Sequence, residues 1–196
     1  GIGSVSMALY VIHARRTGSP VLDFTLLHLA TLRAAVVGGF LFRLGVGALP
    51  FLLPLMLQVG FGLSPFQSGM LTFASAFGAL TMKLTAAPIL RRFGFKHVLI
   101  VNAVASAVLV AVSALFTAAT PHAVIVSVLL VAGFLRSLQF TSLNTLGYCD
   151  IDPGHMSQST SFVGVVQQLA LSSGVAVAAL VLDLLRAADG RTALLP

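Results

Sequence analysis

The sequence predicts an all-α membrane protein, a polytopic transmembrane helix bundle with about five full spans. Of its 196 residues, 58% are hydrophobic and only 8% are charged, against roughly 25% charged residues in an ordinary soluble domain. The apolar runs are long, unbroken and rich in Ala, Leu and Gly, whereas the strands of a membrane barrel alternate apolar and polar residues. The net charge of +6 does not indicate nucleic-acid binding, because Lys and Arg lie scattered at the ends of the apolar segments.

The first 33 residues precede the long apolar segments. Residues 1–13 are too short to span alone, since a transmembrane helix needs about 20 residues. A secretory signal peptide would have its basic residues before the apolar run, and here Arg15 and Arg16 follow it. We therefore interpret residues 1–13 as the second half of a truncated helix, and residues 14–33 as a cytoplasmic loop with an interfacial segment.

A five-helix transmembrane bundle is predicted at residues 34–184. Each segment has about the length that a span requires, and each is bounded by Gly, Pro, Arg or Asp residues that break helices or favour loops. The expected helices are 34–58, 65–90, 97–118, 122–148 and 159–184. We expect residues 185–196 to form a loop before a last helix that this sequence lacks.

The basic residues of the loops predict the orientation of the bundle. Arg91, Arg92 and Lys96 lie between the second and third predicted helices, whereas the loops after the first and third helices contain no Lys or Arg. Basic loops stay on the cytoplasmic side. The loop at 91–96 is therefore expected in the cytoplasm.

Two arginines lie deep inside predicted helices. Arg136 is about 12 residues, or roughly 18 Å, from either end of its helix. An arginine facing lipid at the bilayer centre costs at least ~2.5–3.5 kcal/mol, so we expect Arg136 to face protein or a wet cavity. It could belong to a transport pathway, or it could bind backbone carbonyls where two helices meet. Arg43 lies roughly 15 Å beyond Arg33 by the same rise.

Arg43 shares a helix face with Gly47, Pro50 and Pro54. Such a face leaves the backbone kinked and approachable, as in the cavity helices of transporters. Arg43 could instead extend toward the cytoplasmic surface. Lys83 is only about 12 Å from Arg91, so extension to the surface explains it almost as well as a role in a cavity.

Polar side chains are concentrated on the fourth and fifth predicted helices. Gln139 and Asn144 lie on the fourth helix, and Gln168 lies on the fifth with Gln167 beside it. In hydrocarbon such groups either join helices or line a cavity, and joining helices is the commoner outcome. The third helix, 97–118, is almost entirely Val, Ala and Leu, which predicts a peripheral, lipid-exposed position.

The motifs of enzymes and metal sites are missing from the sequence. All five acidic residues are Asp, at segment ends or in loops, so the predicted spans hold no carboxylate to carry protons. The five His and the one Cys show no metal-ligand spacing, and no phosphate loop or hydrolase motif occurs. We expect no catalytic residue, no bound metal and no cofactor.

Several stretches resemble the major facilitator superfamily, in its fourteen-helix drug:proton antiporter branch. Residues 42–58 and 62–69 look like the first two helices of that family's C-terminal half, and residues 139–145 and 167–174 look like its fourth and fifth helices. Residues 92–96 are similar to the second copy of its cytoplasmic Gly-x-x-x-Asp-Arg-x-Gly-Arg-Lys loop.

That loop departs from the family pattern at two positions, where Arg91 replaces the Asp and Ala87 the leading Gly. The resemblance implies a cytoplasmic gating loop formed by residues Arg91, Arg92, Gly94 and Lys96. It also implies an incomplete C-terminal half of the fold. The N-terminal half of such a transporter usually carries the proton-coupling carboxylates.

The resulting functional hypothesis is part of a secondary active transporter that exports amphipathic drugs or toxic compounds in exchange for protons, by alternating access. Its expected partners are the lipid bilayer, a small-molecule substrate, protons and the missing N-terminal half, without nucleic acid. Its expected location is the cell membrane, as a multi-pass protein of the bacterial inner membrane. The candidate substrate-cavity residues are Arg43, Arg136, Gln139, Asn144, Gln168 and, as a weaker candidate, Lys83.

Two alternatives remain open from the residues alone. Three cations and no acid within the predicted spans would suit a carrier of organic anions or of another solute. A membrane scaffold subunit without transport activity is the other alternative.

Overall fold

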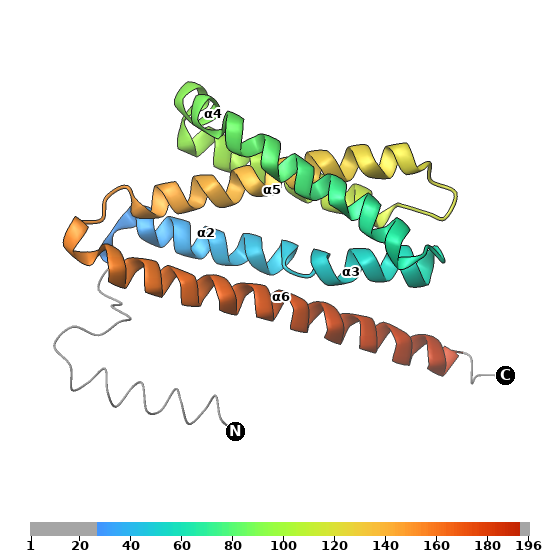
Figure 1. The fold of residues 1–196 in the computed structure, drawn as a ribbon. Coiled ribbons are helices and arrows are strands. Elements are labelled where there is room, and N and C mark those ends of the chain that lie inside the picture. Colours follow the sequence, from blue (N-terminus) through green and yellow to red (C-terminus); the bar gives the residue numbers. More distant parts are fainter. Residues whose placement is uncertain (1–26, 193–196) are drawn as a thin grey trace.

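The computed structural model describes residues 27–192, and all of them that lie in regular elements are helical. The elements are α2 (Ala30–Val46), α3 (Leu49–Leu55), the π-helix η2 (Met56–Gly60), α4 (Pro65–Ala114), α5 (His122–Tyr148), the short 3₁₀ helix η3 (Pro153–His155) and α6 (Met156–Thr192) (Figure 1). The all-α prediction is confirmed for this part of the chain. The predicted helix at 1–13 and most of the predicted loop at 14–33 lie outside it.

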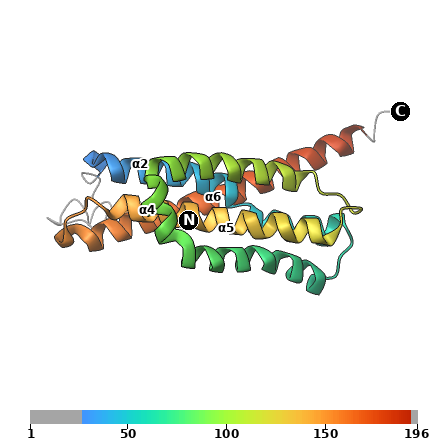
Figure 2. The same cartoon turned by 90° about the horizontal axis from the view of Figure 1, so that it is seen from above.

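The helix α4 contains two legs that run in opposite directions. A straight helix of its 50 residues would measure about 75 Å, more than twice the ~30 Å of a bilayer core. It is broken at Gly94, where φ is 72° and ψ is 157°, a backbone conformation that glycine adopts without a steric penalty. Figure 2 shows the chain turning back within α4, between its two legs.

These two legs, residues 65–93 and 95–114, correspond to the predicted helices at 65–90 and 97–118. Four helices in the described region are long and apolar enough to cross a membrane, and α4 is one of them. Counting α4 as two legs gives the predicted number of about five spans. The expected loop at 91–96 is shorter than predicted, because helical structure continues on both sides of Gly94.

The first predicted helix, 34–58, is broken in the structure. It begins at Ala30, is interrupted at Gly47 and Ala48, and continues as α3 and η2 (Figure 1). Pro50 and Pro54 both lie in α3, and a proline inside a helix cannot donate a backbone hydrogen bond to the preceding turn. The prolines explain the interruption, and the π-helical turn that follows is a further local irregularity.

Glycines allow the helix backbones to touch at two crossings. A Cβ atom added to Gly78 of α4 would collide with the carbonyl oxygen of Leu130 in α5, and one added to Gly133 of α5 would collide with that of Ser75 in α4. At the second crossing, a Cβ on Gly174 of α6 would lie 2.5 Å from the carbonyl oxygen of Leu44 in α2. Small residues at such contacts are typical of packing between membrane helices.

The last helix is longer than predicted. We expected a helix at 159–184 and a loop at 185–196, but α6 continues to Thr192. The loop prediction is therefore wrong for residues 185–192, and residues 193–196 lie outside the described part. The length that a span requires set the predicted end, yet the Leu, Arg and Ala residues at 185–188 are strong helix formers.

Large apolar side chains cover the outer face of the first leg of α4. They recur every three or four residues, which places them along one stripe of the helix, at Phe66, Met70, Phe73, Phe77, Leu80 and Leu84. The second leg is exposed or half-buried except at Val98, Asn102 and Ser106, which are buried. This agrees with the peripheral position expected for that helix, since exposed apolar surface is normal against lipid.

Candidate functional site

Arg136 lines a cavity inside the bundle. The cavity has a volume of about 330 Å³ and lies between α3, both legs of α4 and α5. The guanidinium Nη2 of Arg136 donates a hydrogen bond to Ser75 Oγ at 2.8 Å. Arg136 thus faces protein and a cavity, as expected from its depth in the predicted helix.

The nearby helix crossing explains why Arg136 and Ser75 meet. Arg136 lies three residues after Gly133 on α5, and Ser75 lies three residues before Gly78 on α4. The backbone of Ser75 itself touches α5 at Gly133, and Arg136 follows Gly133 by about one helical turn. At that spacing the short side chain of Ser75 reaches the guanidinium.

The walls of the cavity are apolar apart from Arg136 and three hydroxyl groups. The hydroxyl groups belong to Thr72, Ser75 and Ser113, and none of the residues that line the cavity is acidic. The remaining lining residues are Leu49, Pro50, Leu53, Pro54, Ala76, Ala79, Leu109, Val110, Leu129 and Ala132. The cavity therefore has positive charge at one position and a hydrophobic lining elsewhere.

Arg43 lies in a different, closely packed setting. Its side chain is only 5% exposed, and its Nη2 donates to Asn144 Oδ1 over 3.4 Å. Its guanidinium carbon lies 4.8 Å from the ring centre of Phe140, within the range of a cation–π contact. Gln167 Nε2 donates to the same Asn144 oxygen at 3.0 Å, so the amide of Asn144 connects α2, α5 and α6.

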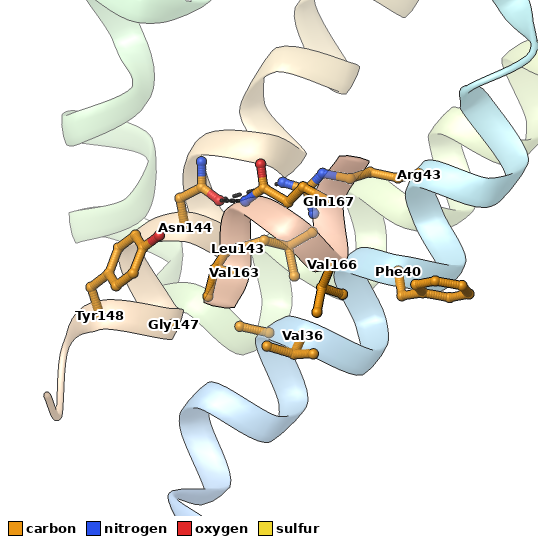
Figure 3. A pocket seen from close by; sticks show the side chains of 11 residues that line it. Val36, Phe40, Arg43, Leu143, Asn144, Gly147, Tyr148, Val163, Val166 and Gln167 are labelled. Atoms are coloured by element: carbon orange, nitrogen blue, oxygen red, sulfur yellow. Dashed lines mark hydrogen bonds between the residues drawn. The ribbon is translucent and has the colours of Figure 1, made fainter. Parts of the chain in front are cut away.

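Figure 3 shows Arg43, Asn144 and Gln167 converging from these three helices. The pocket beside them has a volume of about 10 Å³, which is room for about one water molecule. Gly39 makes space for the arginine, because a Cβ there would lie 2.6 Å from Arg43 Nη1. We call Arg43, Phe140, Asn144 and Gln167 the Arg43 cluster.

Gln139 does not join either arginine. It is buried, and its Oε1 accepts a hydrogen bond of 2.8 Å from Asn102 Nδ2, which also donates to the carbonyl oxygen of Leu135 at 2.7 Å. These bonds join the second leg of α4 to α5. Gln139 therefore lines neither pocket, and its hydrogen bond connects two helices.

The other predicted residues lie on the surface of the described region. Gln168 and Lys83 are both exposed, and neither touches the Arg136 cavity or the pocket of the Arg43 cluster. The residues of the predicted gating loop, Arg91, Arg92, Gly94 and Lys96, are exposed at the bend of α4. Figure 2 places this bend at the same end as the start of α2 and the turn between α5 and α6.

Gln167 and Ser75 are two of the residues of the candidate site that the sequence prediction missed. Gln167 lies seven residues before Gly174, two turns away on the helix face that meets α2, and this spacing distinguishes it from Gln168. Ser75 gave no comparable signal, because it is one of many small residues in its segment. Its role depends on the crossing of α4 and α5, which a single helix pattern does not reveal.

The helical legs, the broken first helix and the arginines inside the bundle define a multi-pass membrane protein with a partly polar interior. A sequence profile described as the Major Facilitator Superfamily matches residues 6–175. The chain belongs to this superfamily, which confirms the resemblance seen in the residues. Membership in a family of transporters points to transport rather than catalysis.

Three relatives share 31% identity with this chain over 183 residues, which is 93% of the chain. They come from Escherichia coli O6:H1, Escherichia fergusonii and Shigella sonnei, and each is named "Putative multidrug resistance protein MdtD". The chain spans 39% of the length of these curated relatives. No solved structure matches it.

Proposed function

We propose that this chain forms part of the C-terminal half of a secondary active transporter that exports amphipathic drugs or toxic compounds in exchange for protons. The observation that carries the proposal is the 31% identity, over 93% of the chain, to relatives named as putative multidrug resistance proteins. The partners of the chain are the lipid bilayer, a small-molecule substrate and an N-terminal half. The location is the inner membrane of a bacterium, as for the Escherichia and Shigella relatives.

The broken first helix supports a mechanism of alternating access. Discontinuous helices surround the substrate sites of many secondary transporters, where the irregular backbone lines a cavity. Here Leu49, Pro50, Leu53 and Pro54 of α3 form one wall of the cavity that contains Arg136. A movement at the break between α2 and α3 would change the shape of this wall.

The two arginines have different parts in the proposed mechanism. Arg136 contacts the substrate or an acidic group of the N-terminal half, because its cavity offers no carboxylate of its own. Arg43 connects α2, α5 and α6 through Asn144 and Gln167, so it holds the three helices together as the half moves.

Proton coupling is assigned to the N-terminal half. Within residues 27–185, the acidic side chains are Asp150 and Asp152 after α5 and Asp183 in the last third of α6. None of them lines the cavity of Arg136. A proton carrier would therefore come from outside this part of the chain.

Export from cells tests the proposal. The complete gene product that contains this sequence would be expressed in a bacterial host without its own major drug pumps. Efflux of ethidium, a cationic dye, and of fluorescein, an organic anion, would be followed with and without a protonophore. The proposal expects efflux of at least one compound that stops when the protonophore is added, and an inactive Arg136→Met variant beside an active Arg33→Met variant.

Three results would contradict the proposal in different ways. Efflux that survives the protonophore would remove proton coupling. Efflux unchanged in Arg136→Met would remove the proposed site. No efflux of any compound tested, from a protein that reaches the membrane, would favour the scaffold subunit.

A further inference from the structure

The cavity beside Arg136 has the size of a small-molecule site. Its volume of about 330 Å³ lies at the lower end of the roughly 300–1,000 Å³ typical of ligand pockets. Ligand pockets in proteins are mostly apolar, with a few polar groups that fix the orientation of the ligand. The leucines and prolines of α3 form one apolar wall, and Leu109 and Val110 of α4 belong to the lining as well.

The hydrogen bonds of the three hydroxyl groups decide which of them can bind an anion. Thr72 donates its hydroxyl hydrogen to the backbone carbonyls of Ser68 and Gly69, and Ser113 donates to that of Leu109. Both hydroxyls therefore present only their oxygen lone pairs to the cavity. Ser75 differs, because its oxygen accepts from Arg136 and its hydroxyl makes no other hydrogen bond to residues 27–192, which leaves its hydrogen for a ligand.

The guanidinium of Arg136 also has donors available. An arginine has five N–H donors, and within residues 27–192 the hydrogen bond of Arg136 goes to Ser75. No acidic side chain lines the cavity to balance its charge. Arg136 is half-buried, and a charge that is partly removed from water attracts an anion and repels a cation more strongly than a fully solvated one does.

We infer that this cavity binds the anionic end of an amphipathic organic acid, a carboxylate or a sulfonate, on Arg136 and Ser75. A planar guanidinium binds such groups through two parallel hydrogen bonds. The apolar body of the ligand packs against Leu53 and Pro54 of α3 and against Val110 of α4. The inference deepens the proposed function, on which it rests for the identity of the cavity as a substrate site, although binding itself requires no transport.

Photolabelling with matched probes tests this inference in the complete purified protein. The anionic probe is 4-benzoylbenzoate, its methyl ester is the neutral probe, and (4-benzoylbenzyl)trimethylammonium is the cationic probe. After illumination, mass spectrometry of the peptides locates the labelled residues. We expect saturable labelling of α3, α4 and α5 segments around the cavity by 4-benzoylbenzoate, and much weaker labelling by the other two probes.

Four variants distinguish the effect of the Arg136 charge from the effect of the cavity shape. Arg136→Met should raise the half-saturating concentration of 4-benzoylbenzoate about 10- to 100-fold, the loss expected for hydrogen bonds to a charged group. Arg136→Lys should keep the preference for the anion with weaker binding. Ala132→Leu keeps the cation but fills the cavity, and should abolish labelling there. Arg33→Met removes an exposed cation at the start of α2 and should change nothing.

Equal labelling of the cavity by the cationic probe, or unchanged labelling of Arg136→Met, would overturn the inference. If Arg136→Met does not fold, the anion preference of Arg136→Lys and the loss of label in Ala132→Leu decide the question. The expected labelling without export of ethidium or fluorescein would uphold the site and refute the proposed function. Export without labelling of the cavity would refute the site and leave the transporter assignment standing.

Discussion

Arg43 and Arg136 lie inside the same helix bundle, but they differ in the space beside each guanidinium that a ligand could occupy. The guanidinium of Arg43 contacts an amide and an aromatic ring, beside a pocket of about 10 Å³. The guanidinium of Arg136 binds one hydroxyl and borders a cavity of about 330 Å³. An arginine in a membrane helix can thus be a packing element or a ligand-binding group.

Neutral partners make this difference possible. Neither arginine forms an ion pair with another described residue in its pocket, since the lining of both pockets contains no acid. Around Arg43 the dipoles of Asn144 and the ring of Phe140 replace water. Around Arg136 the space that could hold such groups is open, so a bound molecule would have to supply them.

The largest expected effect comes from breaking the crossing that places Ser75 against Arg136. In Gly133→Ala, the new Cβ would collide with the backbone carbonyl of Ser75, and a backbone atom cannot move aside as a flexible side chain does. We expect a loss of about 1–3 kcal/mol or more in stability. Thermal unfolding in detergent, followed by circular dichroism, measures it.

Gly69→Ala is the matched control for this variant. Gly69 lies in the same leg of α4 as Gly78, and nothing lies within 4 Å of the position of an added Cβ. Alanine should raise helix stability there by roughly 0.5–1 kcal/mol. Equal destabilisation by both substitutions would contradict the close crossing of α4 and α5.

The Arg43 cluster predicts an intermediate effect. Asn144→Ala removes the oxygen that accepts from both Arg43 and Gln167, and this leaves the buried Arg43 guanidinium and the Gln167 amide without that acceptor. The expected loss is about 1–3 kcal/mol, the cost of a polar group left without its partner. Gln167→Ala removes one bond and should cost less, about 1 kcal/mol.

Gln168→Ala is the control for the cluster, since Gln168 is the exposed neighbour of Gln167. It should change stability by less than about 0.5 kcal/mol. If Gln168→Ala destabilises the protein more than Gln167→Ala, the register of α6 against α5 is different from that described.

The smallest expected effect is on the alkylation rate of Cys149, at the end of the contact between α2 and α5. Thr31 of α2 donates to Asp150 Oδ2 at 2.8 Å, and Cys149, the one cysteine of the sequence, precedes this aspartate. Desolvation, followed by the nearby Asp150 carboxylate, raises the pKa of the Cys149 thiol. Because the thiolate is the reactive form, the raised pKa slows alkylation at neutral pH.

Asp150→Asn should therefore lower the pKa of Cys149 and speed its reaction with a charged maleimide between pH 7 and pH 8. The difference between the two proteins should vanish at a pH well above the thiol pKa, where both are thiolate. Labelling in sealed inverted vesicles, but not in right-side-out ones, would place this end of the bundle in the cytoplasm. The opposite pattern would reverse the predicted orientation.

The sequence predicted the transmembrane spans and the depth of the charged residues better than it predicted the hydrogen-bond partners of side chains. Apolar length defines a span, and the cost of a charge in lipid requires Arg136 to face inward, so both follow from one helix at a time. Partners depend on how two helices cross. Gln139 and Asn144 looked alike on α5, but the first meets Asn102 and the second meets Arg43.

Helix ends were also less predictable than spans. The span length predicts an end of the last helix at residue 184, but α6 continues for eight more residues to Thr192, because Leu, Arg and Ala at 185–188 favour a helix. In contrast, Pro50 and Pro54 indicate the irregular first helix from the sequence alone. A proline lacks the backbone N–H that a helical hydrogen bond needs, and this defect is local and independent of packing.

The most direct test of the contrast compares the thermal stability of Arg43→Met and Arg136→Met in the complete protein without ligand. Arg43→Met should lower Tm by several degrees, because Phe140 and Asn144 lose a packed partner. A loss of about 1 kcal/mol corresponds to roughly 2–4 °C for a protein of 150–250 residues and to less for a larger one. Arg136→Met should leave Tm unchanged or raise it, because the substitution removes a charge without an acidic partner. A Tm that falls in Arg136→Met and holds in Arg43→Met would contradict the account.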